Sequence, residues 1–296
     1  MTPRQYKPYQ DTPRVSQFLT SIYPSVDRQS NWLRARWEYM IYSVQSGLED
    51  HLAPIGIWEA GDEMVAMVNF EESLGEAYFH AHPAHNHLKA EMLSHAEKSL
   101  CSVEDGKRRL ALFVSEFDHE LEAIATAAGY VKPVDSPYET SEFDIATASL
   151  DFSLPGGYRV TDRAEDNDLR RINRVLWRGF NHEGPPPEKY VAGRADVEKA
   201  PLYRPDLVVM IEAPDGDFAS YCGIWYDPAL QVAYVEPVAT DPDYRRMGLG
   251  KAAVLEVIRR AAELGATRAI VGSGQEFYQA IGFQRVFAYY PWQKEW

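Results

Sequence analysis

The chain has 296 residues with an apolar share of 45%, which predicts a soluble globular protein of two domains. A net charge of −14 disfavours binding to nucleic acid, and no apolar run approaches the roughly 18 residues that span a bilayer. Residues 1–10 show no secretory signal, and Cys101 and Cys222 are too few for a disulfide framework. We therefore expect a cytoplasmic protein with two buried thiols and no membrane partner. The net negative charge could serve solubility alone, or it could attract a cationic amine substrate.

The first half of the chain alternates short strands and helices. Two strands around a turn at 60–62 predict a hairpin, and a third strand, a helix, a fourth strand and a second helix follow. The expected ranges are 55–58, 64–70, 76–80, 88–100, 110–114 and 121–128.

Four histidines, His80, His82, His85 and His87, lie close together in this half. Imidazoles at short spacing are common zinc ligands. Pro83 and the short spacing place all four on one loop, however, and no Cys, Asp or Glu pattern completes a ligand set. We favour a solvated loop, so no metal is expected.

The turn-rich segment 153–157 marks a predicted boundary between domains 1–152 and 153–296. A strand at 158–161 and a helix at 164–180 follow it, with Thr161 or Asp162 as the expected helix cap. After an irregular loop, strands are predicted at 207–212 and 218–226, on either side of a turn at 214–216.

A glycine-rich loop occupies 245–250, between a strand at 232–239 and a helix at 252–264. Glycines at such a junction permit unusual φ values and let a ligand approach the main chain closely. The unpaired N–H groups and positive dipole end of the helix then form an anion site. Arg245, Arg246 and Lys251 add positive charge, which indicates a phosphorylated cofactor.

The segments that follow strengthen this interpretation. A short strand at 267–271 and a Gly-Ser-Gly turn lead to Phe277 and Tyr278, then to Gly282 and Phe283. With the 245–250 loop, this order resembles the GNAT superfamily of N-acetyltransferases, which combines an Arg/Gln-x-x-Gly-x-Gly/Ala loop with a Phe-Tyr-x-x-x-Gly-Phe signature. The close resemblance covers about 232–287, and a looser one reaches back to about residue 158.

The resemblance implies two α/β domains in tandem, each a mixed, mostly antiparallel sheet flanked by helices. In the first half, 82–87 contains histidines where the glycine loop would lie. Domain 1–152 is therefore interpreted as a degenerate copy without the cofactor loop, and domain 153–296 as the catalytic copy.

Dinucleotide-binding folds also place a pyrophosphate at a helix N-terminus. Their fingerprint is Gly-x-Gly-x-x-Gly, with an acidic residue about 20 positions later. Here a single Gly-x-Gly pair follows two arginines, and the next strand ends in Gly-Ser-Gly. A Rossmann fold is therefore not predicted.

By resemblance, acetyl-coenzyme A would lie between the glycine loop and the strand before it. Pro237 interrupts that strand, since proline cannot donate to a ladder, and the family's pantetheine arm pairs with the main-chain groups freed there. Ser273 could replace an asparagine that the family commonly has. The expected cofactor-binding residues are Val238, Ala239, Thr240, Arg245, Arg246, Met247, Gly248, Leu249, Gly250, Lys251 and Ser273.

Acyl transfer from a thioester needs a polarised carbonyl, a base for the attacking amine and an acid for the leaving thiolate. The Val238 N–H is the candidate oxyanion donor. Tyr278 is the candidate acid, because a phenol stays protonated at neutral pH; its alternative is packing. Glu236 is the candidate base, although an ordinary carboxylate is a weak base at pH 7. Glu236 could instead form a salt bridge. His182 and Glu183 are the alternative candidates for the base.

The loop after the first helix of the second half borders the acceptor site in this family. Aromatic side chains nearby could line the same pocket, although such residues also form cores. The expected substrate-binding residues are Trp177, Phe180, His182, Glu183 and Trp225, with Tyr203 beside them.

The resulting hypothesis is an N-acetyltransferase that moves an acetyl group from acetyl-coenzyme A to a primary amine of a small molecule or peptide in a ternary complex. Neither cysteine lies in a motif, so no covalent intermediate is expected. A non-catalytic acyl-coenzyme A sensor and an aminoacyl transferase of the peptidoglycan type remain alternatives, and a homodimer is left open.

Overall fold

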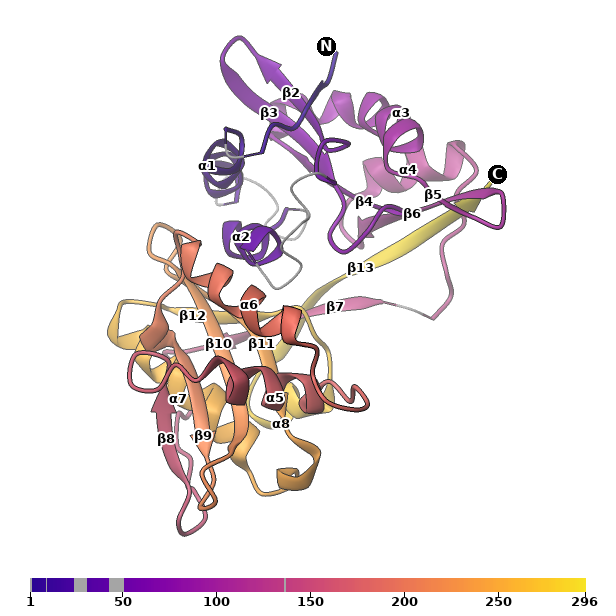
Figure 1. Cartoon of the computed structure of the whole chain (residues 1–296). Helices are drawn as coiled ribbons and strands as arrows, with labels where there is room; N and C mark the ends of the chain where they lie inside the picture. Colours follow the sequence, from indigo (N-terminus) through magenta and orange to yellow (C-terminus); the bar gives the residue numbers. More distant parts are fainter. Residues whose placement is uncertain (1, 9, 24–30, 43–50, 136) are drawn as a thin grey trace. The chain divides into compact units, whose positions relative to one another are not determined.

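The computed structural model in Figure 1 describes residues 2–8, 10–23, 31–42, 51–135 and 137–296. The chain forms two compact units. The first contains Met1–Met40, Gly47–Thr140 and Val286–Trp296, and the second contains Ile41–Ser46 and Ser141–Arg285. No described helix has the length and apolar character needed to cross a membrane.

The first unit is a sheet in the order β1-β2-β3-β4-β6-β13, with β5 beside β6. Every described pairing in it is antiparallel except β4 with β6. Its strands are β1 (Arg4–Gln5), β2 (Gly56–Ala60), β3 (Glu63–Asn69), β4 (Glu76–Ala81), β5 (Ser102–Glu104), β6 (Lys107–Ser115) and β13 (Gln284–Glu295). Its helices are α1 (Thr12–Ile22), α2 (Arg34–Tyr42), α3 (Lys89–Ser99) and α4 (His119–Ala127), with a 3₁₀ turn, η2 (Pro83–Leu88), before α3.

The second unit repeats this plan in the order β8-β9-β10-β11-β12-β7, and here only β11 and β12 are parallel among the described pairings. Its strands are β7 (Tyr138–Asp144), β8 (Arg159–Asp162), β9 (Val208–Glu212), β10 (Phe218–Asp227), β11 (Val232–Thr240) and β12 (Arg268–Val271). Its helices are α5 (Leu169–Gly179), α6 (Glu188–Asp196), α7 (Leu249–Glu263) and α8 (Glu276–Ala280), with 3₁₀ turns η3 (Val197–Lys199), η4 (Pro205–Leu207) and η5 (Pro242–Tyr244). The expected pair of mixed, mostly antiparallel sheets flanked by helices is confirmed.

The two halves of the sequence exchange their last strands. β7, from the first half, pairs with β12 of the second unit between Ser141 and Asp144. β13, at the end of the second half, pairs with β6 of the first unit between Tyr289 and Glu295. The compact units therefore do not coincide with the expected ranges 1–152 and 153–296, because each sheet is completed by a strand from the other half.

The sheet of the second unit separates two packed layers. Alternate residues of β9 face opposite sides, as the period of a strand requires. Val209 and Ile211 belong to the core that α7 covers, whereas Val208 and Met210 pack with α5. In Figure 1, α5 and α7 accordingly lie on opposite faces of this sheet.

Helix α5 begins later than the sequence indicates. Thr161 and Asp162 do not cap it; the cap is Asp168, whose carboxylate accepts from the N–H groups of Arg170 and Arg171. The predicted start at 164 was wrong because the Asp162 carboxylate instead closes a turn with the next main-chain N–H groups.

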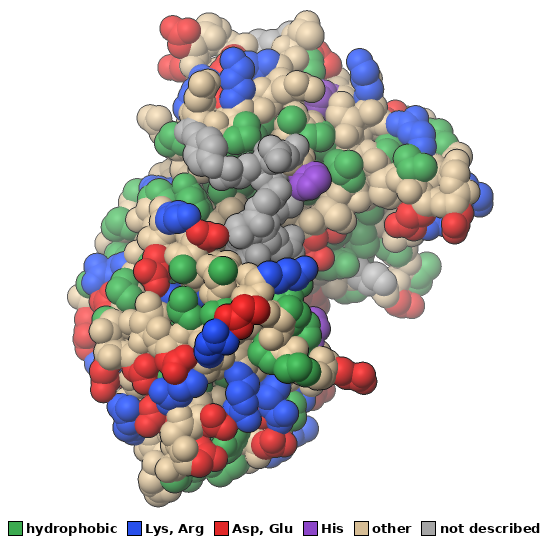
Figure 2. Space-filling model, in the orientation of Figure 1, with side chains coloured by type: hydrophobic (Ala, Val, Ile, Leu, Met, Phe, Trp, Pro, Cys, Tyr) green, Lys and Arg blue, Asp and Glu red, His purple; other side chains and the backbone are tan. Residues whose placement is uncertain are grey.

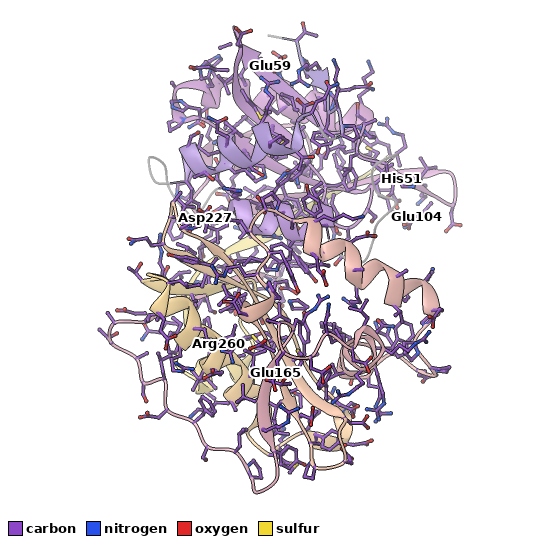
Figure 3. The ribbon with its side chains drawn as sticks, turned by 60° about the vertical axis from the view of Figure 1, so that its left-hand side comes forward. His51, Glu59, Glu104, Glu165, Asp227 and Arg260 are labelled. Carbon is purple, nitrogen blue, oxygen red and sulfur yellow. The ribbon has the colours of Figure 1, made fainter. Side chains whose placement is uncertain are left out.

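Asp162 also meets α7. Arg260 of α7, labelled in Figure 3, donates to the Asp162 carboxylate at 2.6 Å and to the Asp206 carbonyl at 2.9 Å. It also pairs with Glu256 of its own helix at 2.9 Å. One guanidinium thus joins α7 to β8 and to η4.

The loop expected after α5 contains the helix α6, Glu188–Asp196. Pro187 is its N-cap residue, and the helix buries only Gly193. It therefore lacks the apolar period that predicts a helix from sequence. Helices α1 and α2 were also not predicted.

The four histidines do not share one loop. His80 lies inside β4, is fully buried and bonds to Asn69 Oδ1 at 3.0 Å, whereas the others belong to η2 or, as with His82, cap it. Burial, helped by the charge of Arg36, lowers the pKa of His80 to about 3. Across the described residues, no three His, Cys, Asp or Glu side chains are arranged to hold a metal ion.

Candidate active site

The N-terminus of α7 is an open main-chain donor site. Its N-cap residue, Gly248, has φ +80°, and Arg246 before it has φ +64°, so the chain turns sharply into the helix. No side chain caps the helix, and its first turn contains no acidic residue. The first N–H groups of α7 are therefore left for an anion or for water.

The three basic residues near this terminus differ in their contacts. Arg245 donates to the carbonyls of Thr240 and Gly179, at 3.2 and 2.9 Å, and to Asn181 Oδ1 at 2.8 Å. It therefore holds the loop against the end of α5. Arg246 and Lys251 are exposed and have no hydrogen bond or ion pair with the residues that the structure describes.

Gly250 brings the start of α7 close to its neighbours. A Cβ at this position would lie 2.9 Å from Thr240 Oγ1 and 3.3 Å from the Phe277 ring. Leu249 beside it is buried in the core. The absence of a side chain at residue 250 therefore sets how closely α7 approaches β11 and α8.

Strands β11 and β12 diverge next to this terminus. Their parallel pairing covers Val232 to Tyr234 on β11, and the strand then continues to Thr240 without a described partner on that side. On the other side, the Asp241 N–H donates to the Ala219 carbonyl of β10 at 3.0 Å. Because main-chain groups alternate along an antiparallel strand, those of Val238 and Thr240 face the free edge.

The pairing of β10 with β11 is irregular opposite the proline. The register shifts between Cys222, which pairs with Val238, and Ile224, which pairs with Val235. Glu236 and Pro237 of β11 therefore form a bulge opposite the single residue Gly223 of β10. The indole N–H of Trp225 donates to the main-chain carbonyl of Glu236 at 3.0 Å. The interruption expected at Pro237 is thus present in the ladder.

Tyr278 lies on α8 and is 7% exposed. Its hydroxyl forms no hydrogen bond with the residues that the structure describes. Burial raises the pKa of Tyr278 well above its usual value, and the nearby Cys222 and Glu236 raise it further. Tyr278 therefore keeps its proton at neutral pH. It also lies close enough to Glu236 for the charge of that carboxylate to act on it.

Cys222, which was not predicted as a site residue, lies in the same environment. Burial, with Glu236 as the second cause, raises the pKa of its thiol well above the usual value. A protonated, fully buried thiol is a poor nucleophile. The sequence offered no signal for its position, because the pairing of Cys222 with Val238 depends on strand register.

The expected acceptor residues fall into two groups. Trp177 stacks on His182 with ring centroids 4.2 Å apart and donates to the carbonyls of Glu183 and Gly184. Trp225 is 3% exposed, so its ring is part of the protein interior.

Phe180, at the end of α5, is 49% exposed. On the face in Figure 2, acidic and basic side chains are interspersed over the second unit, so no patch of one sign marks an acceptor there.

Ser273 makes two local contacts. Its hydroxyl accepts from the Gln275 N–H at 3.2 Å, and its carbonyl accepts from Ser141 Oγ of β7 at 2.8 Å. The hydroxyl keeps its own proton free for donation.

An ion pair between a half-buried arginine and a buried aspartate, which no sequence pattern predicted, fixes the segment after β11. The Asp241 carboxylate is fully buried and accepts from Arg178 of α5 at 2.6 and 3.1 Å. Burial alone would raise the pKa of Asp241, but the bonds from Arg178 and from the Asp243 N–H lower it. The only sequence signal was an Asp before a Pro, which is typical of a turn.

Helix α3 of the first unit begins differently from α7. Its helix α3 follows directly from η2, and the Lys89 N–H donates to the Asn86 carbonyl. The Lys89 side chain is itself buried and pairs with Asp118 at 2.7 Å.

Comparisons with known proteins agree with this geometry. Residues 169–283 match the family model of the Acetyltransferase (GNAT) family. No curated protein matches the chain.

Solved structures show the fold over the whole chain. A GCN5-related N-acetyltransferase from Sphaerobacter thermophilus has a TM-score of 0.65 at 14% identity, covering 99% of this chain and 95% of that one. A tandem GNAT protein from the clavulanic acid biosynthesis pathway has a TM-score of 0.65 at 12% identity, with coverages of 99% and 97%. A GNAT-family acetyltransferase from Colwellia psychrerythraea has a TM-score of 0.60 at 12% identity, with 99% of each chain covered. Residues 169–283 therefore form an acyltransferase domain of the GNAT family, within a chain that has the tandem GNAT fold.

Proposed function

We propose that the second unit transfers an acetyl group from acetyl-coenzyme A to a primary amine of a small molecule or peptide. The observation that carries this proposal is the uncapped N-terminus of α7 beside the diverging edge of β11. The helix terminus suits the diphosphate of the donor, and the edge suits the amides of its pantetheine arm. Arg246 and Lys251 would add charge at the diphosphate, and Ser273 would donate to the arm.

In the proposed reaction, donor and amine bind together. The amine nitrogen attacks the thioester carbonyl, forming a C–N bond, while the Val238 N–H donates to the developing oxyanion. As the C–S bond breaks, Tyr278 gives its proton to the leaving sulfur, and Glu236 accepts the proton of the amine directly or through water. The protonated Cys222 takes no part, in keeping with a transfer without a covalent enzyme intermediate.

The acceptor would enter beside the Trp177–His182 stack. Glu183 is exposed next to this stack, and its carboxylate could bind an ammonium group. Phe180, two residues before His182 in the sequence, offers exposed apolar surface. We propose these four residues as the acceptor-binding group.

We further propose that the first unit does not bind the donor in the same way. Its α3 starts from a 3₁₀ turn without glycine, and Lys89 there is already paired with Asp118. We place the reaction in the cytoplasm, because Cys101 and Cys222 are both free thiols.

Thiol release from acetyl-coenzyme A, measured against a panel of primary amines, tests this function. Amine-dependent release with acetylated product is expected. Binding of acetyl-coenzyme A without release for any amine would indicate the sensor instead. Absence of coenzyme A binding would overturn the proposal and favour the alternative of an aminoacyl transferase.

A further inference from the structure

We propose that Trp225 is a positioning residue of this transfer reaction, an inference that rests on the proposed function. Its indole N–H holds the main-chain carbonyl of Glu236 on the β10 side of β11. The free edge of β11 can then present the Val238 N–H to the donor without a carbonyl oxygen beside it.

The contact is direct and its donor is rigid. Trp225 Nε1 lies 3.0 Å from the Glu236 oxygen. The side chain is 3% exposed, and its ring meets that of Tyr203 edge-on at 6.2 Å. Because leaving a buried indole N–H without an acceptor costs free energy, this bond favours one position of both groups.

Gly223 provides the space that the carbonyl occupies. It is the β10 residue opposite the bulge of β11, and a Cβ there would be 2.9 Å from the Glu236 oxygen. Any other residue would push that oxygen away. Gly223, by leaving space, and the Trp225 indole, by donating, therefore define the position of the same oxygen atom.

This position matters for the electrostatics of the reaction. The peptide between Glu236 and Pro237 has no N–H, so Val238 supplies the next donor along the strand. A carbonyl turned toward the donor edge would place negative partial charge next to a developing oxyanion and oppose its formation. Keeping the Glu236 oxygen on the far side removes that repulsion.

The test is Trp225→Phe, which keeps a buried ring and removes the N–H. We expect kcat to fall about 10- to 100-fold, because a misplacement of about 1 Å at the reacting atoms can cost about 10²-fold, while KM for acetyl-coenzyme A stays within about twofold. We also expect the infrared carbonyl band of bound ¹³C-acetyl-coenzyme A to shift less from its free position than in the unmodified protein, since the carbonyl would be less polarised.

Trp58→Phe is the matched control. Trp58 is fully buried in the first unit, and its indole N–H donates to Glu91 at 2.9 Å. This variant loses the same kind of bond and should change neither kcat nor the carbonyl band.

A second variant, Gly223→Ala, displaces the same oxygen without changing the indole. It should reproduce the fall in kcat and the smaller band shift, and it serves if Trp225→Phe does not fold. If the unmodified protein is active and the folded variants keep its kcat and carbonyl band, the positioning role is overturned. A lack of thiol release by the unmodified protein would instead contradict the proposed function itself.

Discussion

At the scale of single residues, burial decides the protonation of the groups around the free edge of β11. Tyr278 and Cys222 both have their pKa raised, first by burial and then by the charge of Glu236. A phenol with a raised pKa keeps its proton at every pH where the protein would be assayed. Its ionisation should therefore not limit activity on the alkaline side.

Tyr278→Phe removes this proton. Turnover should fall by about 10²- to 10⁴-fold, while the affinity for acetyl-coenzyme A, measured by calorimetry, should change little. Tyr226→Phe is a control, because it loses a hydroxyl bonded to the Leu264 carbonyl in the same unit. Equal turnover in the two variants would show that Tyr278 only packs.

His80 gives the first unit a pH-dependent stability. Its pKa is about 3 in the folded state, against 6.5 for an unconstrained histidine, so the unfolded state binds more protons between these values. Its stabilising contribution is fully present above pH 6.5 and is lost as the pH falls toward 3. The free energy of unfolding should drop by about 1.5 kcal/mol from this group between about pH 6.5 and about pH 5.

Denaturant unfolding of His80→Gln at both pH values checks this expectation. The variant should lose that part of the pH dependence, whereas His119→Gln, which removes a largely exposed histidine, should keep it. Identical pH dependence in His80→Gln and the unmodified protein would contradict a buried neutral imidazole.

At the scale of elements, the N-terminus of α7 should bind the charged part of the donor. Arg246→Ala combined with Lys251→Ala should weaken acetyl-coenzyme A binding about tenfold, since each exposed cation contributes about 0.5–1 kcal/mol. Turnover of acetyl-pantetheine, which lacks the diphosphate, should be unchanged. Arg259→Ala, on the same helix but paired with Glu256 and Glu263, is the control. Equal losses with both donors would place the diphosphate elsewhere.

The elements around this terminus could be predicted because their signals are local. Gly248 lies in the left-handed region, as its sequence position between strand and helix suggested, and α7 has a regular apolar period. The role of Arg245 was not visible, because its partners Gly179 and Asn181 are more than 60 positions away along the chain. The start of α5 was missed for a different, local reason, since Asp162 and Asp168 are both suitable N-cap residues.

At the scale of the whole molecule, the exchange of strands makes each unit depend on both halves of the sequence. The turn at 153–157 marks a break in the chain, but strand pairing is decided by contacts between distant residues. No local pattern in β13 indicates that it pairs with β6 rather than with β12. The repeated fold could therefore be predicted from sequence, whereas the exchange could not.

Deleting 286–296 tests this dependence. The deletion removes one antiparallel partner of β6 and buried side chains that include Tyr289 and Trp292. At about 1.5–3 kcal/mol for each large apolar side chain, the first unit should lose at least about 3 kcal/mol and unfold at lower denaturant concentration. Deleting Trp296 alone, which removes its two main-chain bonds to Arg108 but leaves the β13–β6 pairing from Tyr289 to Glu295, should lower the midpoint much less. An unchanged unfolding midpoint in the 286–296 deletion would contradict the assignment of β13 to the first unit.

The most direct test of the account is a crystal structure with coenzyme A bound. We expect the diphosphate within hydrogen-bonding distance of the main-chain N–H groups that begin α7, and the pantetheine amides against the edge of β11 at Val238 and Thr240. A nucleotide bound elsewhere, or a side chain filling the helix terminus while coenzyme A is present at saturation, would contradict it.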